Sequence, residues 1–383
     1  MKGQLKIFYI FFILFGMVVS LSLCSKTRNM PMPSNSTVSS TDVSASTLPS
    51  QYIESKEDDA NIYVPIIGYP ADGGACVFTA VPKQFTSEQI HAFLTECDDK
   101  IISCEKRTID GKTRFDAICD SGNELLYISN SQYHPVSAFQ YINQDKFEKY
   151  FCFPIYYSES SYLTNAAFTI GRMFTEPKEF SFASEAEAEQ KVRSALAKLG
   201  LTELELLRTL YIDHQTMEKV GEILTSNVGS ADKSNLPGEW LDTDDAYLFS
   251  FALSVHGIPI SFYSSMRDTA TYSGSNIIVW FANEGITFLT VETPWQVEQA
   301  ENLPSQIISA QTILEKANAR FDSNLVYQDK HIEEIRLQYE YFQNRDKWLL
   351  KPVWQVSLSY GIDGFDGRYY DFMRFNAYTG EEL

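Results

Sequence analysis

One order of elements recurs in this chain and restricts its fold more than any other feature: a helix with one apolar face, then strands with alternating apolar residues. A capping box at Ser184–Glu187 begins one such helix, and Gly200 supplies its left-handed end. The alternation that follows is typical of a sheet, as in Tyr247, Phe249, Phe251, Leu253 and Val255. This pattern predicts an α+β fold with antiparallel meanders.

The same order appears again at an offset of roughly 125 residues, which indicates internal duplication. Ser309 caps the second helix, and apolar residues then alternate with polar ones from Glu334 to Tyr341, which predicts a strand with one solvated face. Two further strands follow, one around Trp354 and one over 368–378. We therefore expect two units, each a helix followed by a meander.

Five cysteines lie close together ahead of these two units and mark a separate small α+β unit: Cys76, Cys97, Cys104, Cys119 and Cys152. In an oxidising exterior, two disulfides and one free thiol are the expected arrangement, and the spacing does not define the pairs. Metal binding is the alternative, but no C-x-x-C pair is present.

The N-terminus carries an export signal. Lys2 and Lys6 precede an apolar run from Ile7 to Leu23, and Leu21-Ser22-Leu23-Cys24 resembles a bacterial lipobox in which Cys24 receives the lipid. Leu23 departs from the small residue usual before that cysteine. We expect lipid attachment at Cys24, with an uncleaved single-span anchor or cleavage and release as alternatives.

A Ser/Thr/Pro-rich stretch over 25–59 is too poor in large apolar side chains to fold by burial and predicts a disordered tether. The expected organisation is a signal segment (1–24), the tether (25–59), the Cys-rich unit (60–160), a first, degenerate helix-plus-meander unit (161–300) and a C-terminal one (301–383).

The end of the chain is similar to a known module. Trp354 in Pro352–Val356, followed by Asn376-Ala377-Tyr378-Thr379-Gly380-Glu381, resembles the PepSY-type module, a helix and meander ending in D-A-x-T-G-E. Asn376 replaces the usual Asp. The layout as a whole resembles exported clostridial-type lipoproteins of Gram-positive bacteria. The resemblance implies an extracytoplasmic binding or inhibitory module, and a similar arrangement occurs in membrane-bound regulators of cell-wall sensor kinases.

Charge and motifs indicate which chemistry to expect. A formal net charge of −19 argues against nucleic acid as a partner. The five histidines form no recognisable catalytic or zinc-binding pattern, so neither a catalytic site nor a cofactor is predicted. Asp242, Asp244 and Asp245 could hold calcium, but solvated or capping carboxylates are the favoured interpretation. Aromatic residues on the last strands are expected in the core rather than on a binding face.

These observations predict a non-enzymatic binding protein, held on the outer face of the cell membrane by a lipid, with a peptide, glycan or envelope protein as partner. One alternative is a regulator or inhibitor that docks on a membrane sensor kinase or a secreted peptidase. Another is a secreted hydrolase without a recognisable motif.

Overall fold

The structure is a computed structural model that describes residues 51–57, 60–67, 74–109, 112–129, 137–151, 173–227, 239–261, 275–301, 303, 305–322, 327–344, 347–362 and 369–383. The signal segment, Cys24, most of the expected tether and Cys152 lie outside these residues. Among the described helices, none is long and apolar enough to cross a membrane.

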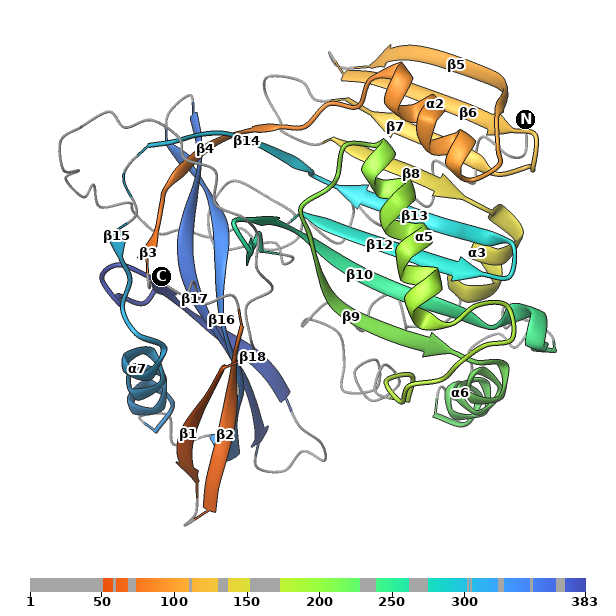
Figure 1. Cartoon of the computed structure of the whole chain (residues 1–383). Helices are drawn as coiled ribbons and strands as arrows, with labels where there is room; N and C mark the ends of the chain where they lie inside the picture. Colours follow the sequence, from red (N-terminus) through yellow and green to blue (C-terminus); the bar gives the residue numbers. More distant parts are fainter. Residues whose placement is uncertain are drawn as a thin grey trace.

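The larger of two main sheets has nine strands in the order β11-β10-β12-β13-β8-β7-β6-β5, with β9 also paired to β10 (Figure 1). All its recorded pairs are antiparallel. Its strands are β5 (Ile101–Ile109), β6 (Lys112–Cys119), β7 (Glu124–Ile128), β8 (Ala138–Ile142), β9 (Leu204–Ile212), β10 (Ala246–Val255), β11 (Ile258–Pro259), β12 (Asn276–Ala282) and β13 (Gly285–Glu292).

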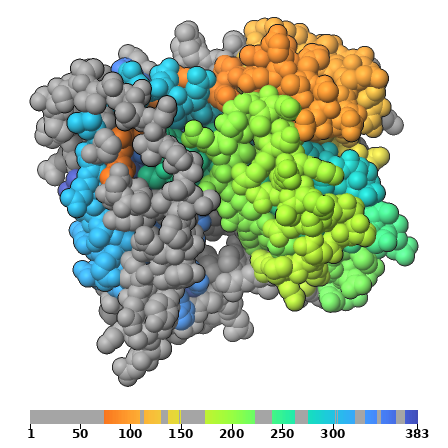
Figure 2. Space-filling model, in the orientation of Figure 1, coloured from red at the N-terminus to blue at the C-terminus, as the bar shows by residue number. Residues whose placement is uncertain are grey.

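Helices cover both faces of this sheet. On one face α2 (Ser87–Glu96) and α5 (Glu185–Lys198) pack against each other and form a continuous surface in Figure 2. The other face carries α3 (Gln144–Phe151) and α6 (His214–Asn227). Neighbouring residues of β10 therefore enter different cores: Phe249 belongs to the buried cluster that includes Phe93 of α2, and Leu248 belongs to the cluster that includes Met217 of α6. Because it is covered on both sides, β10 is almost wholly buried.

The nine-stranded sheet consists of two similar halves. In the first, α2 is followed by β5, β6, β7 and β8, and in the second, α5 is followed by β9, β10, β12 and β13. The last strands of the two halves, β8 and β13, pair in the middle of the sheet, so β5 and β9 lie toward its opposite ends. The helix-plus-meander order is thus present in residues 87–142 as well, which the sequence pattern had assigned to a separate unit.

The smaller sheet has seven strands in the order β1-β2-β16-β17-β4-β14, with β18 also paired to β17. β2 runs parallel to β16, and the other pairs are antiparallel. α7 (Ala310–Asp322) packs on one of its faces. The strands are β1 (Gln51–Glu57), β2 (Ala60–Ile67), β4 (Phe78–Pro82), β14 (Trp295–Ala300), β16 (Tyr327–Asn344), β17 (Lys347–Ile362) and β18 (Tyr369–Asn376); a separate pair joins β3 (Gly74–Ala75) to β15 (Ser305–Gln306).

The sheets do not follow the unit boundaries expected from the sequence. Residues 51–57, which were expected in the tether, form β1 and pair with β2. The expected Cys-rich unit is divided, because β2 and β4 pair with the C-terminal strands β16 and β17, whereas β5 to β8 belong to the other sheet. Pairing between segments more than 250 residues apart leaves no local periodicity to detect.

The prediction that the polar residues of β16 face solvent is wrong at two positions. Gln338 and Glu340 are only 2% and 7% exposed. Glu340 pairs with Arg374 at 3.0 Å, and the side-chain amide of Gln338 donates to Gln355 and to Glu340, each at 3.1 Å. Buried polar groups are tolerated when they are hydrogen-bonded in this way, and such a network has the same sequence alternation as a wet face.

Candidate functional site

The residues of the PepSY-like motif form the end of the C-terminal hairpin and its contact with α7. Trp354 is fully buried, and its indole N–H donates to the carbonyl of Ile308 at 3.0 Å, just ahead of α7. The side-chain oxygen of Asn376 accepts the backbone N–H groups of Tyr378 at 2.9 Å and Thr379 at 3.2 Å. Gly380 closes the turn with a hydrogen bond to the carbonyl of Asn376 at 2.7 Å.

Gly380 needs to be glycine for two reasons. Its φ of +65° lies in the left-handed region, and a Cβ atom would come within 2.8 Å of Ile308 Cδ1. Asn376 supports the turn through its carbonyl oxygen, an acceptor that an Asp carboxylate at this position would supply as well. In this chain, Trp354, Asn376, Thr379 and Gly380 are therefore placed as structural residues.

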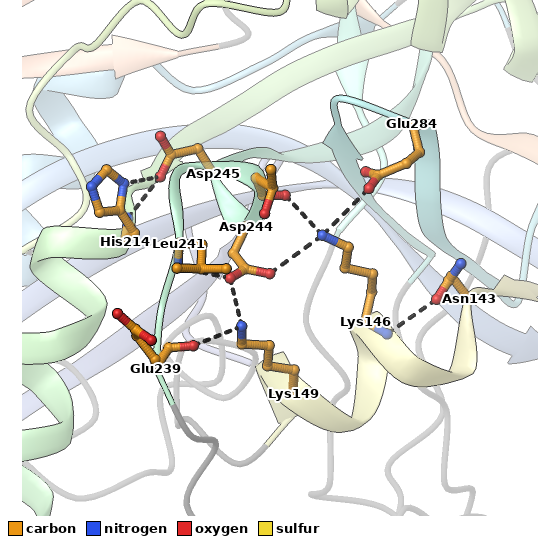
Figure 3. Close-up of polar contacts among 10 residues, drawn as sticks. Asn143, Lys146, Lys149, His214, Glu239, Leu241, Asp244, Asp245 and Glu284 are labelled. Carbon is orange, nitrogen blue, oxygen red and sulfur yellow. Dashed lines mark hydrogen bonds and ion pairs between the residues drawn. The ribbon is translucent and has the colours of Figure 1, made fainter.

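A polar cluster lies where α3 and α6 meet the nine-stranded sheet, and we call it the α3–α6 cluster (Figure 3). It consists of Lys146, Lys149, His214, Asp244, Asp245 and Glu284. From the sequence, Asp244 and Asp245 are possible calcium ligands and His214 is one of five histidines without a pattern; their grouping with Lys146, Lys149 and Glu284 was not predicted, because the members come from separate segments of the chain.

Asp244 is the centre of the α3–α6 cluster. It is 5% exposed, lies in the short 3-10 helix η2 (Asp242–Asp244), and accepts from Lys149 at 2.5 Å and from Lys146 at 3.3 Å. The backbone N–H of Leu241 donates to it at 2.9 Å. Burial alone would raise the pKa of this carboxyl, but these bonds and the two positive charges outweigh burial and hold its pKa below the ordinary value. The carboxylate is thus engaged by two lysines and one backbone amide.

His214 and Asp245 form a second pair within the cluster. The Asp245 carboxylate accepts the backbone N–H of His214 at 2.7 Å and lies 2.8 Å from the ring Nδ1. The hydrogen bond with Asp245 is the main reason why the pKa of His214 is raised. The second ring nitrogen points away from Asp245 (Figure 3). Because His214 is the first residue of α6, Asp245 also places negative charge at the positive end of that helix.

The contacts of the α3–α6 cluster join α3, α6 and η2 to the end of the sheet. Over the described part of the chain, no three His, Cys, Asp or Glu side chains are arranged to hold a metal ion. The ion pairs and hydrogen bonds of the cluster give it a stabilising role. The aromatic residues Tyr339, Trp354 and Tyr360 are buried as well, as expected for core side chains.

The cysteines differ from expectation. No disulfide joins Cys76, Cys97, Cys104 and Cys119, so the two expected disulfides are not formed among the described residues. Cys119 is fully buried beside Asp99, and Cys97 is partly buried at the end of α2. Burial, and then the charge of Asp99, raises the pKa of each of these two thiols to about 12. Cys104 alone of the four is exposed.

Strand β5 forms an open edge of the nine-stranded sheet. It pairs with β6 on one side, and no described strand pairs with its other side. The side chains of residues 102–108 are all exposed. They include Ile102, which is 63% exposed, and the neighbouring Ile118 on β6 is 47% exposed. A long exposed edge strand is a template on which another strand can add.

The hydrogen bonds of β6 show which backbone groups of β5 face outward. The N–H and C=O of Thr113 are bonded to Ser129, on the side away from β5. Thr113 lies opposite Thr108, so these two form a pair without mutual hydrogen bonds, and the backbone groups of Thr108 face outward. Alternation along the regular part of the strand gives the same direction to Lys106 and Cys104. The open edge thus offers three N–H donors and three C=O acceptors.

The corresponding strand of the other half, β9, is covered in part, at its two ends. The N–H of Tyr211 donates to the carbonyl of Phe174 at 2.8 Å, and the last three residues of β9 are buried. The guanidinium of Arg193 on α5 donates to the carbonyl of Leu204 at 3.0 Å. Of the two related strands, β9 is covered at its ends, whereas no described strand or side chain is bonded to the outer edge of β5, which makes β5 the candidate binding surface.

Comparisons with known proteins support the fold and do not name a function. No family model and no curated protein matches this sequence. The fold is similar to the crystal structure of an uncharacterized protein from Eubacterium rectale, with a TM-score of 0.62 and 17% sequence identity, covering 87% of this chain and 93% of that one. The fold class is therefore a mixed α and β architecture dominated by antiparallel sheets, as the sequence predicts.

Proposed function

We propose that this chain is an extracytoplasmic binding protein of the bacterial envelope, tethered to the outer face of the membrane through Cys24, and that β5 takes up an extended segment of a partner protein. The proposal combines the export signal and lipobox-like sequence with the PepSY-like C-terminal unit. The observation that carries it is the open edge of β5, with outward backbone groups at Cys104, Lys106 and Thr108.

The chemistry of this edge suits an extended peptide better than a small molecule. Strand addition takes its affinity from main-chain hydrogen bonds and its specificity from alternate side chains. On one face of the edge the side chains of Cys104 and Lys106 lie beside Ala117 and Phe115, and on the other face Glu105 lies beside Asp116. A bound strand would therefore meet a partly apolar face and a charged face.

A regulator that docks on a membrane sensor kinase or a secreted peptidase is the second candidate. The PepSY-like resemblance favours it, and the same edge could engage an extended segment of such an enzyme. The two candidates differ in the size and stoichiometry of the partner.

Photo-crosslinking tests the proposal in cells that express the full chain. A benzophenone maleimide attached to Cys104 should give a discrete adduct, because the label lies on the edge. A membrane protein in stoichiometric yield supports the regulator, and a short peptide supports a ligand-binding protein. A label at Glu315→Cys in a Cys104→Ser background is the matched control, since Glu315 is exposed on α7.

The decisive comparison is Lys106→Pro. Its outward N–H makes no bond to β6, so proline removes a donor from the edge while the hydrogen bonds to β6 remain. The adduct at Cys104 should be lost in this variant. An adduct of unchanged yield, or the same adduct from the α7 label, would contradict binding at β5.

A further inference from the structure

The thiol of Cys104 lies in the middle of an edge that can pair with a copy of itself. It is exposed, whereas Cys97 and Cys119 are sheltered and their thiols stay protonated. Its backbone N–H and C=O face outward, as derived above from the bonds of Thr113. Both the side chain and the main chain at this position are thus available to a second strand.

Charge limits the registers that two copies of β5 could adopt. In a two-fold antiparallel pair, one residue lies opposite its own copy, and the register is named by that residue. Registers centred on Glu105, Lys106 or Arg107 place a charge against the same charge, which is unfavourable. Centring on Cys104 places an uncharged residue on the axis.

The Cys104-centred register also matches the flanking residues. Ser103 then lies opposite Glu105 of the second copy, and Ile102 lies opposite Lys106, whose aliphatic stem can cover it. A hydrogen-bonded antiparallel pair separates opposite Cα atoms by about 5.5 Å, within the range that a disulfide spans. The bulge between Ile101 and Ser103 limits the paired segment, so contact without the disulfide is weak.

We propose that two copies of this chain pair through β5 about a two-fold axis at Cys104, and that a disulfide between the two Cys104 residues locks the pair and occludes the edge. Pairing of two copies would block the edge of β5 to which the proposed function assigns partner binding. The regulatory effect rests on that proposed function, whereas the pairing itself does not. The occupant is a second copy because the register centred on Cys104 opposes no like charges and brings the two thiols together.

Formation of the disulfide between the two Cys104 residues needs a disulfide oxidant, and glutathione disulfide can act as that oxidant. One Cys104 thiolate attacks it, forms a mixed disulfide and releases one glutathione thiol. The Cys104 thiolate of the second copy then attacks the cysteine sulfur of the mixed disulfide and releases the second glutathione. Two protein thiols are oxidised to one disulfide while one glutathione disulfide is reduced to two thiols.

The test uses the purified protein with glutathione disulfide and no other ligand. Non-reducing electrophoresis and peptide mass spectrometry should show a dimer linked through Cys104, and Cys104→Ser should remain monomeric. Lys106→Pro should slow dimer formation on the order of tenfold, because each copy loses one interstrand hydrogen bond. Matching thermal unfolding curves confirm that each variant is folded.

A charge pair tests the register. Ile102→Glu should speed dimer formation, because residue 102 faces Lys106 of the second copy, and Ile102→Lys should slow it. The proposal would be overturned if Cys104 formed a glutathione adduct but no linked dimer. Equal rates of dimer formation in all variants would also overturn it. Neither of these results bears on the proposed function, which is tested by the photo-crosslinked partner adduct. A disulfide-linked dimer without any partner adduct would contradict the proposed function and leave the self-pairing intact.

Discussion

The thiols differ in reactivity at the scale of single residues. Cys104 is exposed, while burial and the nearby Asp99 raise the pKa of Cys97 and Cys119 to about 12. Alkylation of the native protein near neutral pH should therefore modify Cys104 first, with Cys97 and Cys119 at least about 100-fold slower because little thiolate forms. Time-resolved peptide mass spectrometry measures this order. Modification of Cys119 as fast as Cys104 would contradict the burial described.

His214 should make stability depend on pH. Its pKa is raised above the ordinary value by the hydrogen bond with Asp245, so the histidine stabilises the fold fully below the unfolded pKa of about 6.5, and this contribution is lost as pH rises through the folded pKa. Asp245→Asn should thus cost more unfolding free energy near pH 5.5 than near pH 9, as chemical denaturation can measure. An equal cost at about pH 5.5 and pH 9 would argue against the pair.

Asp244 should make stability depend on pH in the opposite direction to His214. Its pKa is lowered by Lys149, by the Leu241 backbone and by Lys146, despite burial. A carboxylate of this kind stabilises the fold above its unfolded pKa of about 3.9 and loses that contribution as pH falls through the folded pKa. Asp244→Asn should lower the thermal unfolding midpoint at neutral pH, because two lysines lose their buried partner. The difference from wild type should shrink as the pH is taken below about 3.9, and a difference independent of pH would contradict the ion pair.

At the scale of elements, the indole of Trp354 fixes the start of α7 to the smaller sheet. Trp354→Phe should destabilise the protein by about 2 kcal/mol, since the partly buried carbonyl of Ile308 loses its donor and a cavity remains. Phe375→Leu is the control, because Phe375 lies opposite Trp354 on β18 and loses volume without losing a hydrogen bond. Denaturant titration compares the two, and an equal or smaller loss for Trp354→Phe would contradict the role of the hydrogen bond.

Elements with local signals could be predicted from the sequence. The capping box at Ser184 begins α5, Thr86 caps α2, and Ser309 accepts the N–H of Thr312 at the start of α7. Tyr247, Phe249 and Phe251 share one buried face of β10, as their alternation indicates. Helix α6 was not anticipated, because its apolar residues follow directly on strand β9 without a Gly or Pro break.

At the scale of the whole molecule, the strand order of the two sheets depends on long-range pairing, which local sequence patterns could not predict. The join between the two halves at β8 and β13, and the return of β4 to β17, depend on segments that are far apart in the chain. Strand β5 was not predicted, and its open edge was missed with it, because only the pairing of the whole sheet shows that no described strand lies on its outer side. The fold class can be predicted from local sequence patterns alone, whereas the candidate site can be recognised only once the strand order of the complete sheet is known.

The open edge of β5 is the central claim, and amide hydrogen exchange measured by NMR on the Cys104→Ser protein tests it most directly. The amides of residues 104, 106 and 108 face outward and should exchange rapidly, whereas those of Ser103, Glu105 and Arg107 should be protected by β6. This alternation is the predicted result. Uniform protection along residues 103–108 would show that the edge is covered and would contradict the account.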